Sequence, residues 1–332
     1  MEQKQYVLET RDLVVHYDTE DGNVEAVNGI NLKLEPRHTI GLVGETGAGK
    51  TTTALALLRL VPDPPGVIRS GEILINGENI LEKSVKEMEG IRGKEIAMVF
   101  QDPMTALDPV FTVGEQIAES VLQHEKLTQA QANEKVKALL EMVGIPGSRA
   151  KDYPHQFSGG MKQRVVIAMA LACSPKILIA DEPTTALDVT IQAQVLDLMK
   201  RLRDTNDTST IMITHDLGIV AETCDEVAVM YAGRIIEYGT LRDVFKQTKH
   251  PYTEGLFNSL PDVKNKAHKL RPIPGLMPDP TDLPVGCSFS PRCPYATERC
   301  KAERPVPKYV SDTHYVECLR YDEPDFHIER GN

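Results

Sequence analysis

Residues 41–52 read GLVGETGAGKTT, and Gly44 to Thr51 within this stretch match the phosphate-loop pattern G-x-x-x-x-G-K-[ST] in full. The apolar stretch HTIGLVG (38–44) before it is typical of a buried strand, and KTTTALALLRL (50–60) after it is typical of a helix. Glycines let backbone N–H groups curl around an anion, and the N-terminus of the following helix adds positive charge. The stretch therefore predicts a phosphate-binding loop in an α/β protein.

Side chains in and beyond this loop indicate how a nucleotide and its metal would be held. Lys50 is expected to reach the β and γ phosphates, and the Thr51 hydroxyl to ligate Mg²⁺. Downstream, ILIADE (177–182) is an apolar strand that ends in two carboxylates, which are costly to bury without a metal or hydrogen bonds. We expect Asp181 to join the Mg²⁺ shell and Glu182 to polarise the attacking water. The nucleotide is expected to contact the whole loop: Gly44, Glu45, Thr46, Gly47, Ala48, Gly49, Lys50, Thr51 and Thr52.

Hydrophobic periodicity predicts a mostly parallel sheet with an inserted helical part. Residues 7–35 alternate between apolar and polar side chains, which is typical of half-buried antiparallel strands. Strands alternate with helices later in the chain, and this order implies a parallel sheet covered on both faces. The expected later elements are helices near 113–123, 129–143, 159–173, 189–203 and 240–247, buried strands at 176–181 and 210–215, and a hairpin at 228–239.

Composition limits the classes of partner. The chain has 332 residues, with 37 basic and 48 acidic side chains and a formal net charge of −11. This balance argues against a general nucleic-acid binder, whose affinity comes mostly from Lys and Arg on phosphates. The first residues, MEQKQYVLET, lack the basic start and apolar core of a secretion signal, so a cytosolic protein is expected. The longest apolar run, residues 165–173, is too short for a membrane-spanning helix, so any membrane role is expected to be peripheral.

A second glycine-rich stretch, FSGGMKQR (157–164), lies far downstream of the phosphate loop. Ser158 followed by Gly159 and Gly160 at the start of an apolar helix offers an N-cap hydroxyl, N–H groups and a positive helix end. These features predict a second anion site. A single chain has no second bound phosphate that could occupy this site. From the residues alone, a plain helix N-cap is the alternative.

FSGGM (157–161) precedes ILIADEP (177–183) by a short interval, and in this order the chain resembles the ATP-binding cassette (ABC) proteins. In that family two cassettes pair head to tail, and the signature loop of one covers the nucleotide on the phosphate loop of the other. The resemblance implies an α/β fold: a P-loop NTPase ABC cassette with a RecA-like parallel-sheet core, an N-terminal antiparallel β subdomain and an inserted α-helical subdomain. It also implies that the signature loop acts on a partner's ATP through Ser158, Gly159, Gly160 and Met161.

Further residues match the cassette pattern in order. Tyr17 resembles the aromatic residue that stacks on adenine, and Gln101 in VFQDP resembles the glutamine that senses Mg²⁺ and the transmembrane partner. Asp188 in TTALD resembles the loop that faces the other cassette, and His215 in MITHD the histidine that contacts the γ phosphate. The resemblance therefore implies an ATPase with two catalytic residues, Glu182 and His215, and with Mg²⁺ held through Thr51, Gln101 and Asp181.

The sequence departs from the common cassette pattern at a few positions. Thr46, Ala48 and Thr51 stand where Ser is common, and Met161 stands where many cassettes have Gln. None of these changes removes a required donor, because the loop acts through its backbone N–H groups and Thr51 keeps a hydroxyl.

A narrower resemblance rests on residues 153–194, HPYTEGLFNSLP (250–261), PIPG (272–275) and the cysteine-bearing tail. These segments resemble the D-type ATP-binding subunit of dipeptide and oligopeptide importers. A single cassette and a short insert without heptads disfavour translation factors and chromosome ATPases. Importers of nickel or short oligosaccharides remain the alternative, and a non-transport ABC ATPase is a more distant one. The implied domains are a cassette over 5–260, with its helical subdomain about 103–175, and a C-terminal loop-rich, cysteine-containing extension over 261–332.

The same resemblance implies partners and a location. The expected partners are two transmembrane permease subunits, a second ATP-binding subunit that is either an F-type paralogue or a second copy, and an external peptide-binding protein that acts indirectly. No nucleic acid is expected. The protein is expected at the cytoplasmic face of a prokaryotic cell membrane, where ATP binding and hydrolysis would close and reset a clamp.

Four of the six cysteines lie near the end of the chain: Cys287, Cys293, Cys300 and Cys318. Their spacing, C-x5-C-x6-C-x17-C, contains no C-x2-C knuckle and is a poor match to zinc ribbons. The spacing alone leaves an iron–sulfur cluster, a zinc site and unligated thiols open. The peptide-importer resemblance implies a [4Fe–4S] cluster, with Zn²⁺ as the alternative, and such a centre would staple a tail with few apolar residues. Cys173 and Cys224 are expected to be small core residues.

Overall fold

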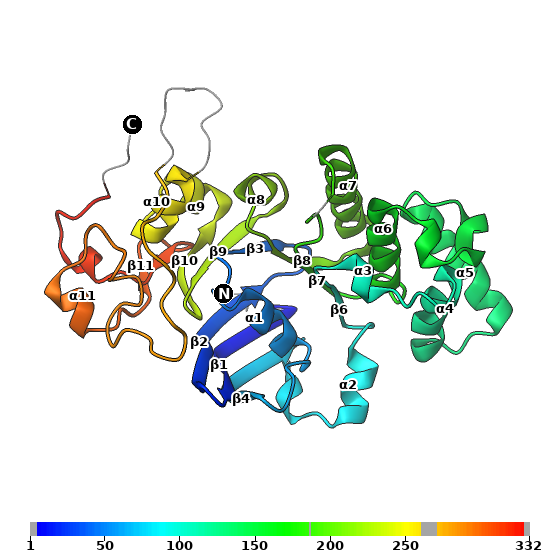
Figure 1. Cartoon of the computed structure of the whole chain (residues 1–332), viewed down its shortest axis with the longest axis horizontal. Coiled ribbons are helices and arrows are strands. Elements are labelled where there is room, and N and C mark those ends of the chain that lie inside the picture. Colours follow the sequence, from blue (N-terminus) through cyan, green and yellow to red (C-terminus); the bar gives the residue numbers. More distant parts are fainter. Residues whose placement is uncertain (1–4, 186, 260–270, 329–332) are drawn as a thin grey trace. The chain divides into compact units, whose positions relative to one another are not determined.

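The computed structural model of the chain (Figure 1) describes residues 5–185, 187–259 and 271–328. The chain divides into two compact units. The first unit holds the described residues among 1–9, 32–39 and 72–214, and the second those among 10–31, 40–71 and 215–332. The domain boundary expected at 260 and 261 lies outside the described residues.

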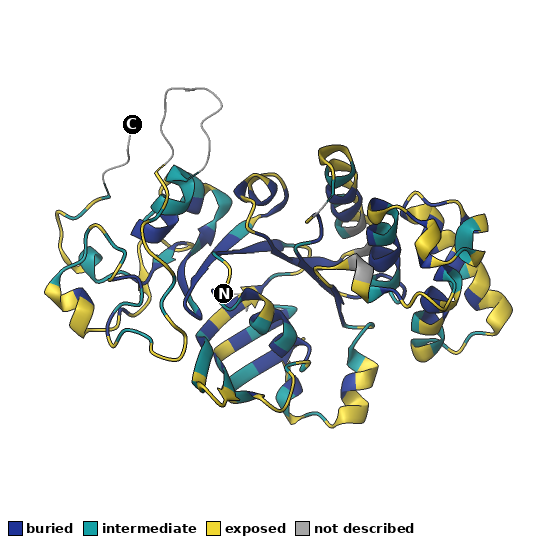
Figure 2. Cartoon of the chain, viewed as in Figure 1, coloured by how far each residue is buried: buried dark blue, intermediate teal, exposed yellow. Residues whose placement is uncertain are grey.

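The first unit contains a parallel sheet in the order β6 (Ile96–Val99), β7 (Ile177–Asp181), β8 (Ser209–Ile213). Every residue of these three strands is buried, as Figure 2 shows for β7 and β8. Strands buried on both faces read as continuous apolar runs, which is why the two strands expected at 176–181 and 210–215 are confirmed. β6 was not among the expected strands.

Helices form the rest of the first unit. The three helices expected between 113 and 173 are confirmed as α4 (Val113–His124), α5 (Gln129–Met142) and α6 (Gly159–Ala170). Thr112 and Thr128 begin α4 and α5 with capping boxes, in which each hydroxyl accepts a hydrogen bond from the third helical N–H. The unit also contains α2 (Val85–Ile91), α3 (Pro103–Ala106), α7 (Val189–Asn206) and the 3₁₀ turns η1 (Ile80–Glu82), η2 (Gly147–Lys151) and η3 (Pro154–Gln156).

The N-terminal strands form the sheet expected over residues 7–35. β1 (Leu8–Thr19) and β2 (Gly22–Leu34) are joined by a two-residue hairpin loop, and the sheet has the order β2-β1-β4-β5 with β4 (Gly66–Ile75) and β5 (Glu78–Asn79). Leu8, Leu13 and Val15 on β1 are buried while their neighbours are partly exposed. This alternation confirms that the strands are half-buried. The residues of β1, β2 and β4 are divided between the two units.

The second unit carries the phosphate loop. β3 (Thr39–Val43) enters the loop and α1 (Lys50–Leu57) follows it. β3 pairs in parallel with β9 (Glu226–Tyr231), and β9 pairs antiparallel with β10 (Arg234–Thr240), which confirms the hairpin expected at 228–239. The remaining helices of this part are α8 (Leu217–Thr223), α9 (Leu241–Lys246) and α10 (Pro251–Asn258).

The C-terminal extension is loop-rich, as expected, and its two short strands add to this sheet. It contains α11 (Glu298–Ala302), β11 (Lys308–Tyr309), β12 (Tyr315–Val316) and η4 (Leu319–Asp322). β12 pairs antiparallel with β10, with Tyr315 opposite Tyr238, and β11 pairs with β12. Phe289, Cys300 and Val316 are buried. The extension therefore has an apolar anchor of its own, which its composition did not indicate.

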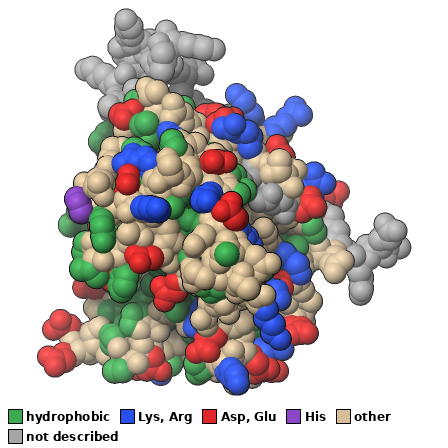
Figure 3. All heavy atoms as spheres, turned by 90° about the vertical axis from the view of Figure 1, so that its right-hand side faces the viewer, with side chains coloured by type: hydrophobic (Ala, Val, Ile, Leu, Met, Phe, Trp, Pro, Cys, Tyr) green, Lys and Arg blue, Asp and Glu red, His purple; other side chains and the backbone are tan. Residues whose placement is uncertain are grey.

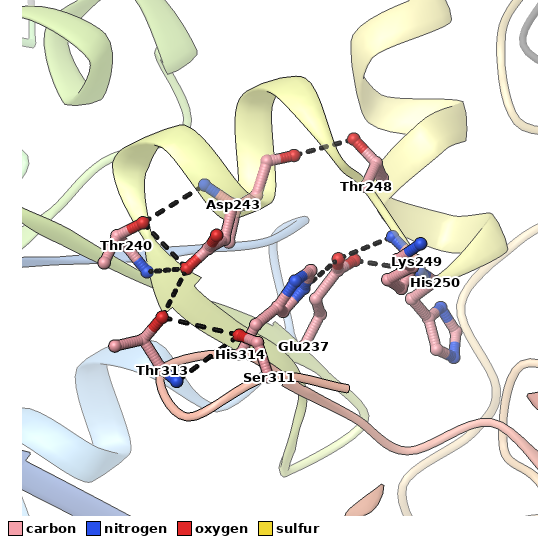
Figure 4. A network of polar contacts seen from close by, with 10 residues as sticks. Glu237, Thr240, Asp243, Thr248, Lys249, His250, Ser311, Thr313 and His314 are labelled. Atoms are coloured by element: carbon pink, nitrogen blue, oxygen red, sulfur yellow. Dashed lines mark hydrogen bonds and ion pairs between the residues drawn. The ribbon is translucent and has the colours of Figure 1, made fainter. Parts of the chain in front are cut away.

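A buried polar network fastens the extension to α9 and α10 (Figure 4). Glu237 is fully buried, and its carboxylate accepts hydrogen bonds from the backbone N–H groups of Lys249 at 2.6 Å and His250 at 2.9 Å. His314 Nε2 lies 2.9 Å from the same carboxylate, and Thr313 Oγ1 donates to Asp243 at 2.8 Å. A buried carboxylate is tolerated when it has partners of this kind. The network fixes residues 313 and 314 against residues 243–250.

Among the helices that the structure describes, none combines the length and apolar character needed to cross a bilayer. The face drawn in Figure 3 carries basic and acidic side chains intermixed, with hydrophobic side chains between them.

Candidate nucleotide site

The phosphate loop of the second unit has the backbone geometry of an anion site. Gly49 is the N-cap of α1 with a φ of 100°, and a Cβ there would lie 2.2 Å from the carbonyl oxygen of Ala26. Glycine is required at this position for two reasons. Other residues rarely adopt this φ, and a side chain would collide with the Ala26 carbonyl group. The N–H groups at the start of α1 therefore face a loop that can close around phosphates.

Lys50 folds back into this loop. Its side chain is buried, and Nζ donates to the carbonyl oxygens of Gly44 at 2.7 Å and Glu45 at 2.9 Å. This position puts a positive charge within the loop, where the phosphates of a nucleotide would bring matching negative charge. The contact of Lys50 with the β and γ phosphates stays a prediction.

Tyr17 lies beside the helix that follows the loop. Its hydroxyl is 3.4 Å from Oγ1 of Thr52 on α1, and its side chain is partly exposed. The structure thus brings the residue expected to stack on adenine to the phosphate loop of the same unit.

His215 is exposed and directly precedes Asp216, the N-cap of α8. The Asp216 carboxylate accepts hydrogen bonds from the N–H groups of Gly218 and Ile219.

In the first unit, Glu182 follows β7 in an unusual backbone conformation. Its φ is 47°, a value that residues other than glycine adopt rarely and that often occurs at functional sites. Gln101 Nε2 donates to Glu182 Oε2 at 2.8 Å, and Thr185 Oγ1 donates to the same oxygen at 3.0 Å. Asp181, at the end of β7, is 2% exposed. The structure therefore brings Gln101 and Glu182 together at a strand end, where a held carboxylate can orient a water molecule.

The signature stretch is braced from inside by neighbouring residues. Gly160 packs against α7, since a Cβ there would lie 2.5 Å from Cγ2 of Ile191. Arg149 Nη1 lies 3.5 Å from Sδ of Met161, and its guanidinium lies 4.3 Å from the ring centroid of Phe157. These contacts hold residues 157–161 in one arrangement.

The start of the same stretch is open. Ser158 takes the N-cap position of α6 as expected, but within the described residues its side chain makes no capping hydrogen bond. A Cβ at Gly159 would meet no atom of the described residues within 4 Å. The predicted N-cap position of Ser158 is confirmed, and the second anion site predicted there stays a prediction. The open surface at residues 158 and 159 leaves room for a group from outside.

Asp188 begins α7. Its carboxylate accepts hydrogen bonds from the N–H groups of Thr190 at 3.1 Å and Ile191 at 3.0 Å. Ile191 also packs on Gly160 of α6. The first turn of α7, which Asp188 caps, therefore contacts the start of the signature helix. The cap is a structural role that sequence reasoning did not assign to Asp188, and its role toward a second cassette stays a prediction.

The four cysteines of the extension are buried to different degrees and are free thiols. Burial raises the pKa of Cys287, and it raises the pKa of Cys293 and of Cys318 to about 12. Backbone N–H groups that hydrogen-bond to the sulfurs act in the opposite direction; they belong to Phe289 and Ser290 at Cys287, Tyr295 at Cys293 and Arg320 at Cys318.

The placement of these thiols does not define a metal site by itself. Within the described parts of the chain, no group of three or more His, Cys, Asp or Glu side chains is arranged to hold a metal ion. A tetrahedral zinc ion would need the sulfurs about 2.3 Å from one point. Of the other cysteines, Cys224 is buried as expected, whereas the core assignment of Cys173 is wrong because it is partly exposed.

Sequence reasoning missed two residues that contact the phosphate loop. Arg292 donates from Nη1 and Nη2 to the Glu45 carboxylate at 2.9 and 3.2 Å, and the Glu45 N–H donates to the Tyr252 hydroxyl at 2.9 Å. Arg292 lies 247 positions after Glu45, so no local pattern could signal the pair.

Comparison with protein families gives matches over two parts of the chain. Residues 27–185 match the family described as ABC transporter, and residues 236–300 match the oligopeptide/dipeptide transporter, C-terminal region. The oligopeptide transport ATP-binding protein OppD of Bacillus subtilis is 51% identical over 93% of this chain and 87% of its own length. The dipeptide transport ATP-binding protein DppD of the same organism is 49% identical over 96% of this chain and 95% of its own length.

Solved structures give the same fold. A post-hydrolysis dimer of the ATP-binding cassette MJ0796 with ADP and Pi has a TM-score of 0.64 at 24% identity, over 71% of this chain and 99% of that one. CbiO1 from Clostridium perfringens, part of the transporter complex cbiONQ, has a TM-score of 0.62 at 30% identity, over 74% of this chain and 92% of that one. These similarities support the cassette fold described above.

Proposed function

The chain belongs to the ATP-binding cassette (ABC) transporter family, and we propose that it is the ATP-hydrolysing subunit that powers import of dipeptides or oligopeptides through separate permeases. The observation that carries the proposal is the similarity to OppD and DppD over nearly the whole chain, including the C-terminal region particular to such transporters. Import of nickel or short oligosaccharides is the alternative that these relatives do not favour.

The proposed roles of the site residues are those that the resemblance to ATP-binding cassettes implies. Lys50 and the loop N–H groups would hold the phosphates, Thr51, Gln101 and Asp181 would serve Mg²⁺, and Glu182 would orient the water that attacks the γ phosphate. The bond from Gln101 to Glu182 supports a joint arrangement of these two side chains. His215 would contact the γ phosphate, and Tyr17 would stack on adenine.

We propose that Ser158 and Gly159 cover the nucleotide bound by a second cassette, either an F-type paralogue or a second copy. The open surface at the start of α6 supports this role. A nucleotide gripped by two chains binds the closed pair better than the open pair, and this differential affinity can move the permeases. Hydrolysis would then reset the clamp.

Attachment to permeases at the cytoplasmic side of the membrane is proposed on the basis of exposed apolar side chains. Phe100, directly before Gln101, is 41% exposed, and Val110 and Phe111 are 69% and 52% exposed. Large apolar side chains left in solvent mark contact sites when they gather near one another. These residues would transmit the state of the ATP site to the membrane subunits.

Reconstitution with the permeases and the binding protein encoded beside this chain tests the transported solute. We expect ATP-dependent uptake of labelled di- and oligopeptides into vesicles, and no uptake of nickel or of short oligosaccharides. Uptake of nickel or sugars without peptides would contradict the peptide assignment. ATP turnover that no permease alters would contradict the transport role.

We further propose that Cys287, Cys293, Cys300 and Cys318 hold a [4Fe–4S] cluster that staples the extension. Four thiolates are a sufficient ligand set, and N–H groups directed at the sulfurs are a common feature of iron–sulfur sites. Such N–H groups act on three of these cysteines. Such a cluster would cross-link the segment, and Zn²⁺ is the alternative occupant.

Protein purified without oxygen is expected to be brown and to contain about four iron atoms per chain, because the four thiols supply every protein ligand that such a cluster needs. Cys318→Ser should lose both the colour and the iron, and metal analysis with absorbance spectra measures both. Cys173→Ser is the matched control and should keep them. Zinc in place of iron would support the alternative, and neither metal in anaerobic protein would contradict the proposal.

A further inference from the structure

Glu45, the second residue of the phosphate-loop pattern, is held by three groups at once. Its carbonyl oxygen accepts from Lys50 Nζ at 2.9 Å, its N–H donates to the Tyr252 hydroxyl at 2.9 Å, and its carboxylate accepts two hydrogen bonds from Arg292. Lys50 belongs to the loop itself, but Tyr252 lies on α10 and Arg292 lies in the extension. The N–H and the side chain of Glu45 are therefore held from outside the loop, and its carbonyl oxygen is held from within it.

Arg292 is itself held firmly. Its side chain is 7% exposed, Nε donates to the carbonyl oxygen of Pro274 at 2.9 Å, and Nη1 lies 3.4 Å from the Tyr231 hydroxyl. A guanidinium that donates two hydrogen bonds to one carboxylate fixes the orientation of the carboxylate as well as its distance. The Arg292 side chain thus fixes the position of the Glu45 carboxylate. Arg292 directly precedes Cys293 in the chain.

Tyr252 is anchored by aromatic packing with the same part of the extension. Its ring centroid lies 5.5 Å from that of Phe289 and 4.6 Å from that of Tyr231, and the Tyr231 and Phe289 centroids are 5.2 Å apart. Burial raises the pKa of Tyr252, so its hydroxyl stays protonated while it accepts the Glu45 N–H. Phe289 lies between Cys287 and Cys293, so one short segment contributes both the ring and the guanidinium.

The start of α10 is fixed as well. Glu237 binds the N–H groups of Lys249 and His250 and contacts His314 of the extension (Figure 4). His250 then caps the helix, because its Nδ1 accepts from the Tyr252 N–H at 3.1 Å. Burial lowers the pKa of His250 to about 3, which keeps the ring neutral and able to accept. Tyr252 is therefore positioned by the extension from two directions.

We propose that Arg292 and Tyr252 are positioning residues for the phosphate loop, so that segment 287–293 of the extension helps to set the affinity for Mg-ATP. The loop acts through the orientation of its backbone N–H groups, and a loop that is already in its binding shape has less entropy to lose on binding. Loss of the grip on Glu45 would loosen that shape. This inference rests on the proposed function only in taking ATP as the ligand of the loop.

The test measures the Kd of Mg-ATP and the thermal midpoint of the full-length chain. Arg292→Gln is expected to raise Kd roughly fivefold or more, the usual range of coupling between sites. Glu45→Ala, which removes the other end of the contact, should also raise Kd. Removing this negative charge would by simple electrostatics favour an anionic ligand, so the expected sign distinguishes positioning from charge. Tyr252→Phe keeps the ring and should give a smaller rise.

The double variant and a control complete the experiment. In the Glu45→Ala background, Arg292→Gln should have little further effect; a full additional effect would mean that Arg292 acts by charge alone and would overturn the inference. Arg299→Gln removes surface ion pairs with Glu303 and Asp322 in the same extension and should leave Kd unchanged. Unchanged Kd in Glu45→Ala overturns the inference even where Arg292→Gln fails to fold. Wild-type protein that binds no Mg-ATP would instead contradict the proposed function.

Discussion

Glu182→Gln is expected to lower ATP turnover by about a thousandfold while Mg-ATP binding persists. The amide keeps the size of the side chain and can still accept hydrogen bonds from Gln101 and Thr185, which contact the carboxylate at 2.8 and 3.0 Å. It cannot take a proton from the attacking water or polarise it as a carboxylate does. Phosphate release at saturating Mg-ATP measures the loss, and equilibrium titration with a fluorescent ATP analogue measures binding.

Glu87→Gln is the matched control for this change. Glu87 accepts hydrogen bonds from Ser84 in the capping box of α2. The substitution replaces one carboxylate oxygen by an amide nitrogen, as in Glu182→Gln, but on the protein surface. Its turnover should equal that of the unmodified protein. Turnover in Glu182→Gln close to that of the control would contradict the assignment of Glu182 as the residue that polarises the attacking water.

Elements defined by local patterns could be predicted from the sequence. The phosphate loop, β7 and β8 follow from continuous apolar runs next to glycine or carboxylates, and α4 and α5 follow from helical periodicity with Thr at each start. In these segments the pattern that identifies the element lies within a few consecutive residues. The site residues that belong to such segments could therefore be named from the sequence.

Features that depend on distant pairing could not be predicted. β12 has two residues, too few to show a period, and it exists because β10 offers it a partner. The contact between Glu45 and Arg292 joins a residue of the phosphate loop to a charged residue far along the chain that belongs to no motif.

Gly159→Val is the second change with a large expected effect, and it tests whether a partner's nucleotide lies on the signature loop. Within the described residues of this chain, a Cβ at position 159 would have open space, so folding and binding of Mg-ATP should be unaffected. A nucleotide held by a second cassette would meet the new methyl groups, and N–H donors at the start of α6 would lose contact with it. We expect turnover to fall roughly a hundredfold, the usual cost of losing one such donor.

Gly160→Ala separates this effect from damage inside the chain. Its new methyl group would overlap Ile191, since the Cβ position is only 2.5 Å from Cγ2 of that residue, so this variant should lose thermal stability before it loses anything else. Gly159→Val should show the reverse, with a normal thermal midpoint, normal Kd for Mg-ATP and little turnover in the assembled transporter. If Gly159→Val keeps full turnover, Ser158 and Gly159 only begin a helix, and the nucleotide is not shared between two chains. The pair of neighbouring glycines therefore distinguishes a surface that receives a partner from one that packs within the chain.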